Sequence, residues 1–296
     1  LAGWIKKKDG GTEASEEAIM RLLVAISSSC LTTALALTQW ASAVRIISKG
    51  NENVRASFLP DLAAGRKFTT VGISQLTTSR QHLRRPILIA RRIDTGWSLD
   101  GLCPWVTGAD SVNTLVTGAV PMDSEGYQAS PHFFILELNT SGIQVAPPMK
   151  LLALTGSRTS SIDLKNALTD VEISPQTESG PQTGGLATTA LAIGSTRASL
   201  AILEQESFGR DTLKPISEEL NKEVLSLEAI LFQAATYGID TQERNLLRQR
   251  ANTLVTRTSQ ATLTASKGAG FVEGHPIERL ILSLIHISEP TRHHVI

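Results

Sequence analysis

The stretch WSLDGLCPWVTGADSVNTLVTGA, which runs from Trp97 to Ala119, decides the fold of this chain. It holds two runs of β-forming residues, separated by the turn residues Gly108-Ala109-Asp110. Further short runs of the same kind continue on both sides, from about Phe68 to Ser174, with no helical pattern between them. Regular short strands separated by turns predict a small antiparallel barrel or sandwich.

Helical patterns flank this β region on both sides. Before it, Ser15 precedes a run with helical spacing, and a short helix is predicted over 51–62, ending at Gly65. After it, a Pro/Gly/Ser/Thr-rich linker over 174–185 leads to three long helices, which are expected over 186–203, 216–237 and 241–267. The predicted order is therefore helices, a β domain and a helix bundle.

Composition excludes several classes of protein. The 28 Lys and Arg residues balance 28 Asp and Glu residues, so no net positive field exists to recruit nucleic acid. The two cysteines cannot form a disulfide framework, which makes a reducing cytoplasm the expected location. The apolar stretch Leu22–Ile47 contains many hydroxyl side chains that lipid would leave unsatisfied, so we expect buried helices there and no membrane span.

The C-terminal tail has an unusual sequence. Leu282–Arg292 reads LSLIHISEPTR, which resembles the translation of a common sequencing adapter. We therefore expect residues from about 282 onward to be artefactual, and His286, His293 and His294 to form no metal site. Because the chain also begins at Leu1 and not at Met, we expect it to be truncated at both ends.

The central stretch resembles the middle β domain of the acyl-CoA dehydrogenases. Its Asp100-Gly101 turn, Trp105-Val106-Thr107-Gly108 and Ala109-Asp110 follow that family's pattern. Further stretches that resemble the family's motifs follow in the same order: 154–161 with Val171, 192–198, 267–271 and 275–279. The resemblance extends from about Glu16 to Leu282.

The resemblance implies a multi-domain α+β fold. A helical N-terminal domain would cover 1–66, a small antiparallel β barrel 67–176 and a C-terminal four-helix bundle 183–281, with 282–296 as the artefactual tail.

The resemblance also implies FAD as cofactor and places it near the β domain. In the family the Trp packs against the flavin ring and the Thr hydroxyl bonds it, which assigns Trp105, Val106 and Thr107 to cofactor binding. Ser74 would supply a hydroxyl in the first flavin-binding strand. Without the resemblance, Trp105 would be interpreted as an ordinary core tryptophan of a strand and Thr107 as a strand hydroxyl.

Two glycines imply a partner subunit. Gly268 and Gly270 stand where the family lets its backbone approach a diphosphate, often that of a neighbouring subunit's FAD. We therefore expect a homodimer or homotetramer.

The chain also departs from the family's pattern. In the run 74–81, Gln75 and Leu76 replace a Glu and a Pro, and Arg80 stands where a small serine is usual; it could pair with a phosphate or lie on the surface. No Arg stands near Gly185, and Thr264 replaces a Gln.

No residue can be named as the catalytic base. The family's Glu would fall at about Thr291, inside the tail, or near Thr183, where this chain has no Glu. Glu178 is close to the second position, but it lies in the predicted linker, where a carboxylate is solvated.

The function expected first is an FAD-dependent acyl-CoA dehydrogenase, which forms a double bond in an acyl-CoA thioester and passes hydride to flavin. Because the base is missing, the 296-residue chain itself is expected to be inactive. A flavin monooxygenase of the same fold, or a non-catalytic member that acts as a binding partner, are the alternatives.

Overall fold

The computed structural model of the chain describes two compact units, which we call the β unit and the helical unit. The β unit comprises residues 1–14, 36–150 and 155–183, and the helical unit comprises 15–35, 151–154 and 184–296. Within these, the residues described are 1–77, 86–123, 126–127, 130–173 and 185–283. The contacts thus group residues 15–35 with the C-terminal helices, and the three-domain division by sequence stays a prediction.

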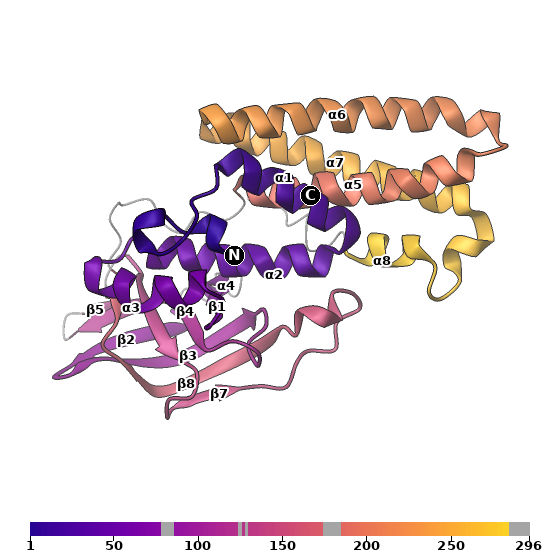
Figure 1. The fold of residues 1–296 in the computed structure, drawn as a ribbon. Coiled ribbons are helices and arrows are strands. Elements are labelled where there is room, and N and C mark those ends of the chain that lie inside the picture. Colours follow the sequence, from indigo (N-terminus) through magenta and orange to yellow (C-terminus); the bar gives the residue numbers. More distant parts are fainter. Residues whose placement is uncertain (78–85, 124–125, 128–129, 174–184, 284–296) are drawn as a thin grey trace. The chain divides into compact units, whose positions relative to one another are not determined.

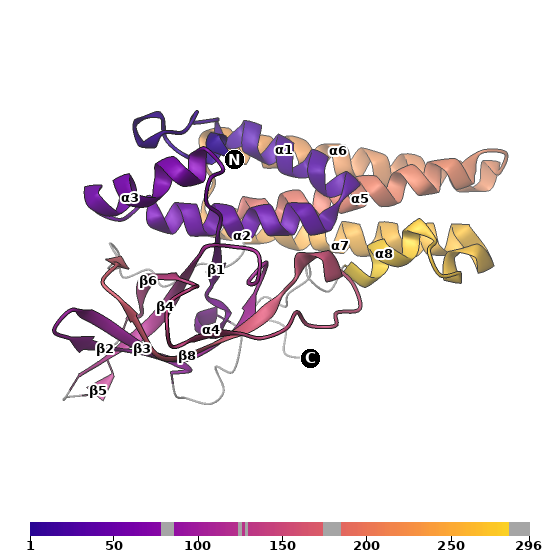
Figure 2. The ribbon, with the colours of Figure 1, turned by 60° about the horizontal axis from the view of Figure 1, so that its bottom comes forward.

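The helical unit is built on three long helices that run side by side (Figure 1). The predicted helices are confirmed nearly to their ends. A further helix from the N-terminal part of the chain packs on α5 and α6 (Figure 2). The helices of the unit are α1 (Glu16–Ser29), α5 (Leu186–Ser207), α6 (Lys214–Tyr237), α7 (Thr241–Ser266) and α8 (Pro276–Ser283).

Side-chain caps set where these helices begin. Ser15 accepts a hydrogen bond from the Ala18 amide at 3.2 Å, and so caps α1. Asp240 caps α7 in a capping box with Glu243. These caps satisfy amides that would otherwise have no partner at the helix N-termini.

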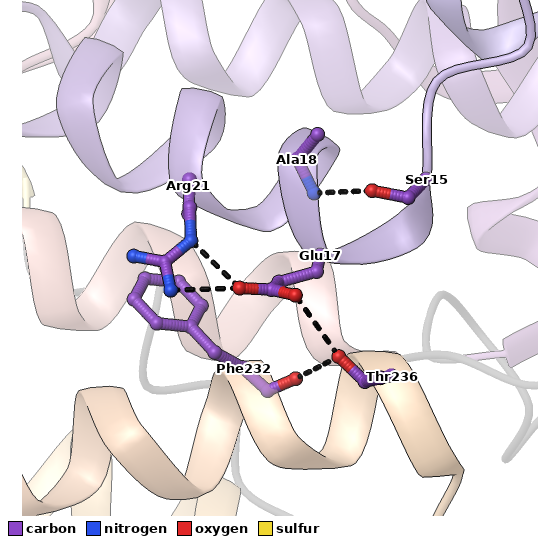
Figure 3. Close-up of polar contacts among 6 residues, drawn as sticks. All are labelled: Ser15, Glu17, Ala18, Arg21, Phe232 and Thr236. Carbon is purple, nitrogen blue, oxygen red and sulfur yellow. Dashed lines mark hydrogen bonds and ion pairs between the residues drawn. The ribbon is translucent and has the colours of Figure 1, made fainter.

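One polar contact joins α1 to α6 (Figure 3). Glu17 accepts hydrogen bonds from Arg21 at 2.8 Å and from the Thr236 hydroxyl at 3.1 Å. The Arg21 guanidinium lies 3.9 Å from the centre of the Phe232 ring, in a cation–π contact. The first turn of α1 is thereby fixed to the end of α6.

The apolar stretch Leu22–Ile47 is two helices and not one span. α1 ends at Ser29, Cys30 is extended with φ −150°, and α2 covers Leu31–Ile47. Among the residues that the structure describes, only α5 has the length and hydropathy to cross a membrane, and 61% of its apolar window is buried inside the protein.

The β unit holds a sheet whose described strands follow the order β7-β8-β3-β2-β4-β6-β9, with β1 and β5 also paired to β4. The predicted strands are found, but the sheet is not wholly antiparallel, because β1 and β2 each run parallel to β4. The strands are β1 (Thr69–Gly72), β2 (Leu88–Ile93), β3 (Gly96–Val106), β4 (Thr114–Asp123), β5 (Gly126–Tyr127), β6 (His132–Glu137), β7 (Ile143–Val145), β8 (Ser160–Thr169) and β9 (Glu172–Ile173).

The core of the β unit lies on two faces of this sheet. One apolar cluster is formed within the sheet by residues such as Leu99, Phe134 and Ile162. A second packs other strand residues against the residues of α2 from 36 onward and against α3 (Glu52–Ala63). α3 ends as predicted, because Gly65 takes the left-handed φ of +69° that favours glycine after a helix.

Candidate functional site

The end of β3 places Trp105 on the outside of the sheet. The ladder between β3 and β8 shifts register between Cys103 and Val106, where Pro104 has no amide hydrogen to donate. Val106 beyond the shift is fully buried, whereas Trp105 is 46% exposed. The interpretation of Trp105 as a core residue is therefore wrong. Trp97, on the same strand, is the buried one.

Four hydroxyl side chains lie together beyond Val106, and we call them the hydroxyl cluster: Thr70, Thr107, Ser157 and Thr159. The Thr70 hydroxyl donates to the Thr107 carbonyl at 2.8 Å. The Thr107 and Thr159 hydroxyl oxygens lie 3.4 Å apart, and those of Thr159 and Ser157 lie 2.8 Å apart. The cluster links β1, the end of β3 and the chain before β8, so it holds the Thr107 hydroxyl at the strand end.

An ion pair also joins two of these segments, the turn after β3 and the chain before β8. The Arg158 Nε lies 2.9 Å from both carboxylate oxygens of Asp110, and the Gly108 amide donates to the Ser157 carbonyl at 2.8 Å. The hydrogen bond from Arg158 holds the pKa of the Asp110 carboxyl below its ordinary value. Both residues belong to motifs noted in the sequence, but their pairing, across 48 residues, is a product of the fold.

Ser74 lies on a short helix, α4 (Ser74–Thr77), and not in the strand predicted from the sequence. β1 ends at Gly72, two residues earlier. α4 packs beside β3. Gly72, at the end of β1, also lies close to the end of β3, since a Cβ on Gly72 would lie 3.0 Å from Val106 Cγ2. The β unit therefore brings α4, the end of β1 and the end of β3 close together.

Gly268 and Gly270, the two glycines assigned to cofactor binding, differ from each other. Both lie in the 3-10 turn Lys267–Phe271 after α7. Gly270 is buried, and a Cβ there would lie 2.9 Å from Leu263 Cδ1 and 3.4 Å from Ile277 Cγ2, so packing within the unit explains this glycine. Gly268 is exposed with open space around it, which leaves it free for a backbone approach by a ligand.

Several sequence predictions concern residues outside the described ranges. These are Arg80, Glu178, Thr183 and Thr291.

Among the described residues no group of three or more His, Cys, Asp or Glu side chains could hold a metal ion. The carboxylate beside the hydroxyl cluster is Asp110, and its lowered pKa makes it a weak proton acceptor.

The arrangement suits a flat aromatic ligand with polar edge atoms. The exposed indole of Trp105 offers an apolar face, and Thr107, the half-buried member of the hydroxyl cluster, can donate and accept hydrogen bonds. Thr70, Ser157 and Thr159 are buried and support Thr107 from within. An isoalloxazine ring has this chemistry, so the residues present fit a flavin.

Comparison with models of protein families and with curated proteins found no match. Among solved structures, butyryl-CoA dehydrogenase from Megasphaera elsdenii superposes with a TM-score of 0.81 at 18% identity, over 97% of this chain and 82% of that one. The fold is that of the acyl-CoA dehydrogenases.

The same fold also carries other chemistry. KijD3, solved in complex with FMN and a dTDP-linked amino sugar, matches with a TM-score of 0.81 at 17% identity, over 99% of this chain and 80% of that one. Dibenzothiophene monooxygenase from a Paenibacillus species matches with a TM-score of 0.78 at 15% identity, over 96% of this chain and 81% of that one. At these identities the likeness establishes the fold, and an argument about the reaction has to rest on the site.

Proposed function

We propose that this protein is a flavin-dependent oxidoreductase that binds FAD and dehydrogenates an acyl-CoA thioester. The observation that carries the proposal is the 46% exposed Trp105 beside the hydroxyl cluster. An exposed indole at a strand end, next to a half-buried hydroxyl, can stack on a flat aromatic ligand and bond its polar edge. A cytoplasmic location and self-association are parts of the same proposal.

The residues of this chain would position the flavin. Trp105 would cover one face of the ring, and the hydroxyls of Thr107 and Ser74 would bond its polar edge. The flavin, when bound, supplies two-electron redox chemistry. Asp110 is not proposed as the base, because its hydrogen bond to Arg158 lowers the pKa of the carboxyl and makes it a weaker proton acceptor than an ordinary aspartate.

A flavin-dependent monooxygenase is the second candidate. It is favoured by the lack, among the described residues beside the hydroxyl cluster, of a carboxylate that could act as base. Reaction of reduced flavin with oxygen needs no base for an α-proton, so this site would be sufficient for it. A non-catalytic binding partner would bind flavin or acyl-CoA without turnover.

Flavin binding tests the first step. The purified protein, incubated separately with FAD and FMN, is expected to retain the visible absorbance of FAD after gel filtration. Trp105→Ala should weaken binding about tenfold, because stacking contributes about 0.5–1.5 kcal/mol beyond burial, and Trp105→Phe should recover most of it. Tyr237→Ala, which removes another exposed aromatic side chain, is the matched control. A colourless protein, or equal affinities in all variants, contradicts the proposal.

The reaction is tested on the flavin-loaded protein. Bleaching of the flavin absorbance by an acyl-CoA without oxygen supports the dehydrogenase. Oxygen uptake with reduced flavin, without bleaching by acyl-CoA, supports the monooxygenase. Because no base is identified in the 296-residue chain, flavin binding without either response is expected of the dehydrogenase as well, and it does not distinguish the non-catalytic alternative.

A further inference from the structure

The side chain of Gln75, the residue after Ser74, makes three hydrogen bonds inside the β unit. Its side chain is 7% exposed. The amide nitrogen Nε2 lies 3.1 Å from the Gly72 carbonyl oxygen, 3.1 Å from the Thr117 hydroxyl and 3.0 Å from the Gly118 carbonyl oxygen. One side chain of α4 is therefore bound to the end of β1 and to β4.

The neighbours of Gln75 require a donor at this point. The two carbonyl oxygens can only accept. The Thr117 hydroxyl uses its own proton on the Gly72 carbonyl at 2.6 Å, so toward Gln75 it also accepts. Three acceptors face one nitrogen, and the opposite orientation of the amide would set oxygen against oxygen. An ionised carboxylate, which the family's pattern has here, would be repelled from the same place.

The buried group next to this network stays neutral. Cys103 Sγ lies 3.2 Å from the Thr117 hydroxyl, and burial raises the pKa of this thiol to about 12. It therefore keeps its proton at ordinary pH and can donate it to Thr117. Its neighbour Asp163 opposes ionisation of the thiol further.

The amide also carries a cost. Gln75 Oε1 is buried, and within the described residues no group donates a hydrogen bond to it. A buried acceptor without a partner destabilises the folded state. The three hydrogen bonds of Nε2 offset this cost, and they also meet a structural need.

The need is the position of α4. A helix of four residues has too few internal hydrogen bonds to hold itself in place. Leu76, the next residue, packs so closely on β4 that a Cβ at Gly118 would lie 2.3 Å from its Cδ1. The side chains of Gln75 and Leu76 thus fix α4, and Ser74 with it, beside the end of β3.

We propose that Gln75 is a positioning residue of the flavin site: as a hydrogen-bond donor it holds α4, which carries Ser74, in place beside β3. The inference rests on the proposed flavin binding. It differs from the sequence-based interpretation, in which Gln75 was a loss relative to the family's carboxylate.

The test compares Gln75→Glu with Gln75→Met by flavin titration of the purified protein across pH. At about pH 8 both variants should bind FAD at least about tenfold more weakly than the wild type, because the donors are gone. On lowering the pH to about 5.5, Gln75→Glu should regain affinity relative to the wild type. Its buried carboxyl takes up a proton and becomes a donor again. Gln75→Met, which has no proton to gain, should not recover.

The outcomes separate the two proposals. A wild-type protein that binds no flavin overturns the proposed function, and this inference with it. A wild type that binds FAD while Gln75→Glu binds equally well at about pH 8, or shows the same pH dependence as Gln75→Met, overturns the positioning role alone. Circular dichroism of each flavin-free variant monitors folding. If Gln75→Glu does not fold at about pH 8, Thr117→Val removes one of the three acceptors. Unchanged affinity for FAD in that variant overturns the inference, and a several-fold loss that does not vary with pH supports it.

Discussion

At the scale of single residues, the ion pair of Asp110 with Arg158 ties stability to pH. The hydrogen bond from Arg158 makes the pKa of Asp110 lower in the folded protein than in the unfolded chain. Its contribution to stability is therefore fully present above the ordinary carboxyl value of about 4, and it is lost as the pH falls through the lower folded value.

We predict that Asp110→Asn melts at a lower temperature than the wild type at neutral pH, and that the two converge as the solution becomes strongly acidic. Circular dichroism followed during heating at several pH values measures this. Asp170→Asn, which changes an exposed carboxylate of the same unit, is the control. If the melting temperatures of wild type and Asp110→Asn differ by the same amount at every pH, ionisation of Asp110 contributes nothing to stability.

The sequence indicates which residues belong to functional motifs more easily than it indicates what those residues contact. Trp105, Thr107, Asp110 and Arg158 all lie in motifs visible in the sequence. The donor role of Gln75 could not be predicted, because its acceptors at Thr117 and Gly118 are 42 and 43 residues away. Such partners are set by strand pairing, which local patterns do not specify.

At the scale of elements, long periodic patterns were predicted well and short ones poorly. Helices such as α6 and α7 have a sustained apolar period with a clear cap or stop, and their predicted ends differ from the structure by only one or two residues. α4 was missed, because four residues after a β-forming run carry no helical period. The parallel pairing of β1 and β2 with β4 was also missed, since alternation within a strand does not reveal its neighbours.

The contact between α1 and α6 in Figure 3 gives a prediction at this scale. Hydrogen bonds from Arg21 and then Thr236 lower the pKa of Glu17, so the contact is strongest above the ordinary carboxyl pKa and weakens as the pH falls. We expect Glu17→Gln to lower the melting temperature by a few degrees at most at neutral pH, because surface pairs are weak. The difference should shrink in acid.

A neighbouring glutamate supplies the control for that experiment. Glu16→Gln removes a charge from the same first turn of α1, and so matches the change in interaction with the helix dipole. If both variants lose the same stability, the loss is not specific to the contact of Glu17 with Arg21 and Thr236.

At the scale of the whole molecule, apolar side chains gather on the surface at one end of the helical unit. Phe208 follows α5 and is 92% exposed; Phe271 follows α7 and is 78% exposed. The ends of these two helices are joined by a hydrogen bond from Arg210 Nη1 to the Ala265 carbonyl at 2.8 Å. Exposed aromatic rings at one end of a helix bundle are favourable to cover, and self-association through this end would fit the homodimer or homotetramer expected from the glycine motif.

We therefore predict that the protein self-associates through this end of the bundle. Light scattering at micromolar concentration should give a multiple of the 31.8 kDa chain mass. The double variant Phe208→Ser, Phe271→Ser should shift that mass toward a single chain, because it removes the two exposed aromatic rings at this end of the bundle. Tyr237→Ser is the matched control, since its ring is 83% exposed but lies at the other end of α6. A wild type that is monomeric contradicts self-association itself. An associated wild type whose mass is unchanged by the double variant, or lowered equally by Tyr237→Ser, would place the interface on another surface.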